Sequence, residues 1–204
     1  RIARFRPGPD AGDEAGARLD DINWCAATLN ELDVTLEMQP GSAWGQSVRE
    51  ARAKVAKRLS DTIRGTSRAV EAALPMTRTT LAGRMTRKVP DLTVDPASEA
   101  LATAEVQVRM LGSVHSAAGV FGCESDRKRQ ADALVEMLGR HADEAFDLIH
   151  GEEVEDVDRA LALMEIVARF LTHLQAPDAA RTVRRRATAT IHAMPPYRAS
   201  PEAA

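Results

Sequence analysis

Aromatic residues are scarce in this chain, at 3% of its 204 residues. A hydrophobic core must therefore be built mainly from aliphatic side chains. Runs of β-branched or aromatic residues long enough for a strand are missing and alanine is abundant, which together favour helices over sheet. The length suits one domain that can bury a substantial core. The sequence therefore predicts a single all-α domain.

Cysteine and long hydrophobic runs are also scarce. The two cysteines, Cys25 and Cys123, lie far apart and outside any C-x-x-C spacing, which argues against a zinc knuckle or a redox pair. This usage favours a reducing, cytoplasmic setting, although a bridge between the two stays open because the sequence does not place their Cα atoms. No hydrophobic run is long enough to cross a bilayer, and no apolar segment follows the basic start of the chain. Neither a transmembrane segment nor an intact signal peptide is expected.

Apolar side chains recur at helical spacing between residues 13 and 194, flanked by an irregular arm at 1–12 and a tail at 195–204. The expected helices are 13–38, 42–74, 96–119, 125–150, 155–175 and 177–194. The second helix, of about 30 residues, would span roughly 45 to 50 Å. The fifth is the most apolar and is expected to be central. An apolar stripe from Trp44 to Ala73 on the second helix is expected to be buried, as are Cys25 on the first helix and Ile191 on the last. The prediction is a bundle of about six helices.

Three local features mark the helix ends. Ser42 is expected to cap the second helix, and Asp95 with Pro96 is expected to start the third. Gly151 is expected to end the fourth in a left-handed conformation. The connection 77–88 lies among prolines and is rich in threonine and arginine, and it is expected to form a short helix or a loop.

The charge of the chain is unevenly distributed. Residues 41–90 carry 11 basic and 3 acidic side chains, a net charge of +8, whereas the whole chain has a net charge of −3. On the outer side of the second helix four cations, Lys54, Lys57, Arg64 and Arg68, alternate with three acids, so that this side is nearly balanced. A functional basic patch is therefore expected in the connection 77–88 instead.

No nucleophile elbow, phosphate loop or supported pair of carboxylates is present, so no catalytic residue, metal ligand or cofactor is assigned. A second apolar stripe on the first helix, which includes Trp24, favours a protein partner or a homo-oligomer. The sequence therefore predicts a non-catalytic interaction or assembly module, a scaffold or regulatory adaptor. Its expected partner-binding residues are Trp24, Val34, Met38, Arg78, Arg84, Arg87 and Lys88.

Nucleic-acid binding is the first alternative. It would use the cations of the connection together with a second basic cluster on the last helix, and phosphate neutralisation would make it strongly salt-dependent. No aromatic stacking platform accompanies these cations. The cluster on the last helix has two competing interpretations: pairing with the acids at 152–156, and a solvated face, which is favoured over that pairing. The residues of this alternative are Arg84, Arg87, Lys88, Arg181 and Arg185.

A phosphotransfer or metal-binding protein is the second alternative. The spacing of His115 and Gly119 resembles the phosphoacceptor helix of histidine phosphotransfer domains, but Ala118 replaces the usual lysine and His115 is expected on the core face. Asp147 and His150 resemble half of the carboxylate-histidine motif of di-iron bundles, with Asp143 one turn before them. The other half of that motif is missing, so a solvated polar face is the better interpretation.

Overall fold

The structure is a computed structural model that describes residues 13–35, 42–80 and 86–193. These residues form seven helices and two strands, which confirms the all-α bundle. The elements are α1 (Asp13–Thr35), α2 (Ala43–Ala73), β1 (Met76–Thr80), β2 (Thr86–Pro90), α3 (Glu99–Ser113), α4 (His115–Val120), α5 (Glu124–His150), α6 (Val157–His173) and α7 (Pro177–Ala193).

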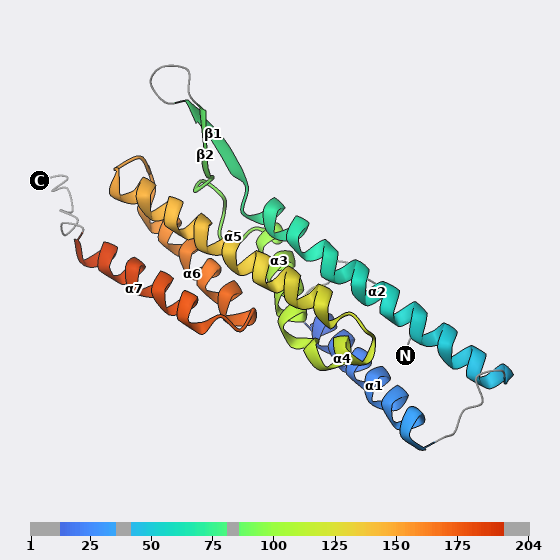
Figure 1. Cartoon of the computed structure of the whole chain (residues 1–204). Coiled ribbons are helices and arrows are strands. Elements are labelled where there is room, and N and C mark those ends of the chain that lie inside the picture. The colour runs from blue at the N-terminus through green and yellow to red at the C-terminus, as the bar shows by residue number, and fades with distance from the viewer. Residues whose placement is uncertain (1–12, 36–41, 81–85, 194–204) are drawn as a thin grey trace, which may run out of the picture.

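The bundle is elongated, with α2 and α5 as its long members (Figure 1). Helix α3 packs against α2, α5 and α6, and α1 packs on the far side of α3 and on α4. Helix α6 lies among α3, α5 and α7, so that eight of its 17 residues are buried, in keeping with its apolar sequence. Helix α5 contacts α2, α3, α4, α6, α7 and β2, which makes it the element that joins the two ends of the bundle.

Helix α2 follows its sequence pattern closely. It begins where Ser42 Oγ accepts a hydrogen bond from the Gly45 backbone N–H at 3.0 Å, as expected of a cap. The predicted stripe is buried from Val55 to Ala73, and the hydroxyl of its one polar member, Thr66, donates to the Thr62 carbonyl at 3.1 Å. Trp44, in the first turn, was expected on this stripe but is 50% exposed, because α2 extends past its neighbours there.

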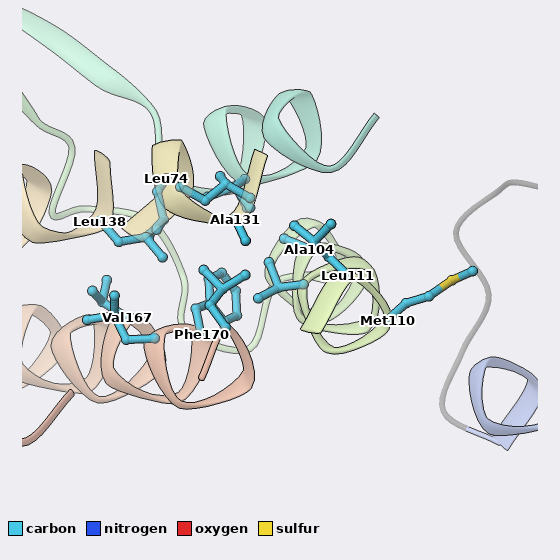
Figure 2. Packing of buried hydrophobic residues seen from close by; sticks show 14 of the residues in the cluster. Leu74, Ala104, Met110, Leu111, Ala131, Leu138, Val167 and Phe170 are labelled. Carbon is cyan, nitrogen blue, oxygen red and sulfur yellow. The ribbon is translucent and has the colours of Figure 1, made fainter. Parts of the chain in front are cut away.

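The centre of the core lies where α3, α5 and α6 meet (Figure 2). Leu138 of α5, Phe170 of α6 and Leu111 of α3 point toward one another and are almost completely buried. Met110 points away from this group. Burial of each large side chain contributes about 1.5–3 kcal/mol, so this aliphatic cluster stabilises the bundle without many aromatic rings.

The third expected helix differs from the structure at both ends. It begins at Glu99, capped by Ser98 Oγ, while Asp95 Oδ1 accepts from the Ala97 N–H in the preceding turn. It ends at Ser113, and the short α4 follows after Val114. The change of direction moves Val114 into the core and His115 out to solvent, so the expected core position of His115 was wrong.

One expectation about a helix end and one about a helix face also need correction. At the end of α5, Gly151 has an ordinary φ of −79°, and the left-handed residue is Glu152 with φ of 56°. The Glu153 N–H then bonds the Leu148 carbonyl at 3.0 Å. On α7 the buried positions include Val183 and Thr190, whereas Ile191, expected in the core, is 57% exposed.

The connection after α2 is a β-hairpin, neither a short helix nor a loop. Strands β1 and β2 pair antiparallel, with Met76 opposite Pro90 and Thr80 opposite Thr86. Alternating threonines suit this pairing because β-branched side chains fit a pleated surface. The Asp91 N–H bonds the Pro75 carbonyl at 2.9 Å and closes the base of the hairpin.

The two cysteines are free and buried, so the bridge that the sequence left open is not formed. Cys25 packs in the core beside Ile22 and Leu29, as its spacing predicts. Cys123 Sγ lies 3.2 Å from Ser60 Oγ, which ties the start of α5 to α2.

Candidate interaction surface

The base of the hairpin is anchored to the helical body while its outer part projects from it (Figure 1). Val89 is 5% exposed, and β2 packs against α5. Thr77 Oγ1 donates to the Val89 carbonyl at 3.4 Å across the hairpin. The exposed positions of both strands are therefore held at a fixed register relative to the bundle.

Three predicted partner-binding cations lie on this hairpin. Arg78 of β1 is directly opposite Lys88 of β2, and Thr79 is opposite Arg87. All three cations are exposed, and none forms an ion pair with another described residue. Side chains directly opposite each other share one face of a sheet, so Arg78 and Lys88 place two like charges side by side, which is unfavourable. The fourth predicted cation, Arg84, lies outside the described residues.

The second predicted surface, on α1, is described only in part. Trp24 is 47% exposed, on the opposite side of α1 from the buried Ile22 and Leu29. The side chain of Val34 and the whole of Met38 lie outside the described part of the chain. The structure therefore places one large exposed aromatic on α1 and leaves the rest of the expected stripe untested.

The arginines of α7, predicted as a second basic cluster, are mostly paired. Arg184 donates three hydrogen bonds of 2.9–3.2 Å to the Glu165 carboxylate, which raises the pKa of Arg184. Arg181 pairs with Asp178 one turn earlier. Arg185 is exposed and pairs with no described residue.

Arg186 joins α7 to α5. It pairs with Asp143, and its guanidinium lies 4.5 Å from the centre of the Phe146 ring. The acids that were expected to pair with α7 lie elsewhere: Asp156, for example, caps α6 at the Arg159 N–H and pairs with the Arg159 side chain at 3.1 Å. Pairing with the acids at 152–156, one of the two interpretations of this cluster, is therefore wrong, since Arg184 and Arg186 reach Glu165 in the middle of α6 and Asp143 in the second half of α5.

Three residues of the phosphotransfer and metal alternatives each contact a neighbouring side chain. His115 is exposed, and its Nε2 lies 3.1 Å from Ser116 Oγ. Asp143 is bound to Arg186, and His150 Nε2 lies 3.3 Å from Thr190 Oγ1. Within residues 13–35, 42–80 and 86–193 no group of three or more metal-ligating side chains comes together. Nor does any helix of these ranges have the length and apolar character needed to span a bilayer.

Comparisons with known protein families, curated proteins and solved structures find no match for this chain. The class of protein is therefore defined by its architecture alone. The described residues form a seven-helix bundle from which a basic hairpin projects. Any functional assignment depends on the chemistry of that hairpin and its surroundings.

Proposed function

We propose that this chain is a non-catalytic interaction module that binds an acidic segment of a protein partner through its β-hairpin. The observation that carries the proposal is the placement of Arg78 directly opposite Lys88 on an exposed, anchored hairpin. Their mutual repulsion destabilises the hairpin of the unbound protein by about a few tenths of a kcal/mol or more. A carboxylate bound between them replaces that repulsion with two attractive interactions.

A protein segment fits this surface better than nucleic acid does. Each strand of a two-stranded sheet has one edge without a strand partner, and an extended peptide can pair with such an edge through its backbone. Of the two α7 arginines that the nucleic-acid alternative uses, Arg181 pairs with Asp178, whereas Arg185 is exposed and pairs with no described residue. Nucleic-acid binding would then depend on the hairpin and Arg185.

The proposal is tested by fluorescence anisotropy with a labelled poly-glutamate peptide and a labelled DNA duplex at several salt concentrations. We expect the double variant Arg78→Glu with Lys88→Glu to weaken peptide binding at least tenfold, because it reverses both charges of the pair. The matched control, Arg64→Glu with Arg68→Glu on the exposed side of α2, makes the same change in net charge. It should change the affinity by less than threefold, since these charges lie on another element and are screened by salt.

Equal losses in both variants would reduce the interaction to net charge and refute a hairpin site. Tighter binding of the duplex than of the peptide at the same salt concentration would instead support the nucleic-acid alternative.

The half-exposed Trp24 supports α1 as a second contact face, for a protein partner or a second copy of the chain. A reducing, cytoplasmic location is part of the same proposal, supported by two free thiols.

A further inference from the structure

A cavity of about 560 Å³ lies where the end of α2, the base of the hairpin and α5 meet. Leu74, Met76, Met137 and Leu138 form its apolar wall. The volume falls within the range of about 300–1,000 Å³ that is typical of small-molecule sites. Methionine side chains adjust to the shape of what they contact, so the two methionines suit a wall that accepts a ligand.

Two of the α5 side chains that line this cavity each carry a buried polar atom without a partner among the described residues. His141 is 6% exposed, and its Nε2 has no hydrogen-bond partner in the described part of the chain. Oε2 of Glu144, one turn further, is likewise buried and unpartnered among these residues. Burial lowers the pKa of His141 to about 4, so its imidazole is neutral at pH 7. Buried polar atoms in native proteins normally have partners, which marks this place as one where a bound molecule would supply them.

The charges around the cavity define the kind of molecule. A carboxylate such as that of Glu144 only accepts hydrogen bonds, so its partner must be a donor, and an ammonium group is the strongest one. Lys88 of the hairpin and Arg140 of α5 line the same cavity and are exposed, so they lie toward its mouth. An acidic group at that end of the ligand would face two cations, with only Glu71 opposing it.

We propose that this cavity binds a small aliphatic zwitterion, with its ammonium group at Glu144 and His141 and its acidic group at Lys88 and Arg140. The hydrocarbon between the two groups lies against the methionines and leucines of the wall. This site shares Lys88 with the partner-binding surface of the hairpin, but Arg78 and Arg87 do not line it.

Isothermal titration calorimetry on the full chain tests the proposal with three probes, ε-aminocaproate, hexylamine and hexanoate. We expect ε-aminocaproate to bind at least tenfold more tightly than either of the others, since each of those lacks one charged end. Glu144→Gln should lower the affinity for ε-aminocaproate about tenfold, which is the effect of losing one charge-assisted hydrogen bond. Glu136→Gln, an exposed position of the same helix outside the cavity, should leave the affinity unchanged.

Methyl NMR of the unaltered protein gives a readout that needs no variant. The signals of Met76 and Met137 should shift on addition of ε-aminocaproate, while that of Met164, fully buried in α6, should not. The proposal is overturned if hexanoate binds as tightly as ε-aminocaproate, if Glu144→Gln has no effect, or if no probe moves the two methionine signals at millimolar concentration.

Discussion

Replacement of Gly112 by alanine is expected to destabilise the bundle strongly, although Gly112 lies in the last turn of a helix, α3. A Cβ atom at this position of α3 would lie 1.9 Å from the His173 carbonyl oxygen and 2.9 Å from its carbonyl carbon. Carbon–oxygen contacts of the closest ordinary kind are about 3.3 Å, so α3 and the end of α6 must separate by more than 1 Å. Both contacting atoms belong to the backbone, which means that no side-chain rotation relieves the clash.

The expected loss follows from two opposing effects. Exchange of glycine for alanine in a helix interior is worth about 0.5–1 kcal/mol in favour of alanine. Overpacking in a dense core costs about 1–3 kcal/mol, and the separation also weakens the 3.2 Å bond from Gln175 Nε2 to the Gly112 carbonyl, worth about 1 kcal/mol. The clash outweighs the helix preference, and we expect a net loss of about 2–3 kcal/mol.

Urea denaturation followed by circular dichroism measures this loss, with Gly139→Ala as the matched control. Gly139 also lies inside a long helix, α5, but a Cβ there has no neighbour within 4 Å. Gly139→Ala should therefore stabilise the protein by about 0.5–1 kcal/mol. If Gly112→Ala is as stable as Gly139→Ala, the close approach of α3 to α6 is wrong.

Two further predictions concern charged groups. His141 has its pKa lowered to about 4 by burial against an ordinary value of 6.5, so its contribution to stability is complete above pH 6.5 and is lost as the pH falls toward 4. At 1.36 kcal/mol per pH unit, the stability lost by pH 4 is about 3 kcal/mol. The difference in unfolding free energy between the native protein and His141→Gln should shift by that amount between pH 7 and pH 4. A difference that stays constant with pH would contradict this prediction. Arg186→Ala should cost about 1–1.5 kcal/mol, the sum of an exposed ion pair with Asp143 and a cation–π contact with Phe146. Arg185→Ala should stay within about 0.5 kcal/mol in the same urea titration, and equal effects of the two would show that Arg186 does not join α7 to α5.

Periodicity predicted the long helices well and the short elements poorly. Helix α2 keeps one apolar stripe from Val55 to Ala73, and this local signal is repeated often enough to fix both the helix and its buried face. The hairpin has five residues in each strand, and an alternation of threonine and arginine over so short a length is also compatible with a helical turn. Its strands are stabilised by pairing with each other and by the burial of Val89 against α5, and neither is visible in a local window.

The charged surface was predictable in composition but not in arrangement. The sequence places Arg78 and Lys88 in one basic segment, but only the register of the hairpin sets them opposite each other. Likewise Arg184 pairs with Glu165, 19 residues away in the sequence, and Arg186 pairs with Asp143, 43 residues away. At such separations the charge pattern along one helix does not predict which residues pair. Only one clue pointed to His141: it lies three residues after Leu138, at the border of the buried stripe of α5.

Lys88 belongs to both proposed sites, which links them physically. It lies opposite Arg78 on the hairpin and also lines the cavity beside α5. The acidic group of a molecule in the cavity would neutralise Lys88 and remove part of the attraction for an acidic partner. By thermodynamic linkage, binding of the partner must then lower the affinity for the small molecule by the same factor. A cavity ligand that left partner binding unchanged would therefore show that Lys88 serves only one of the two sites.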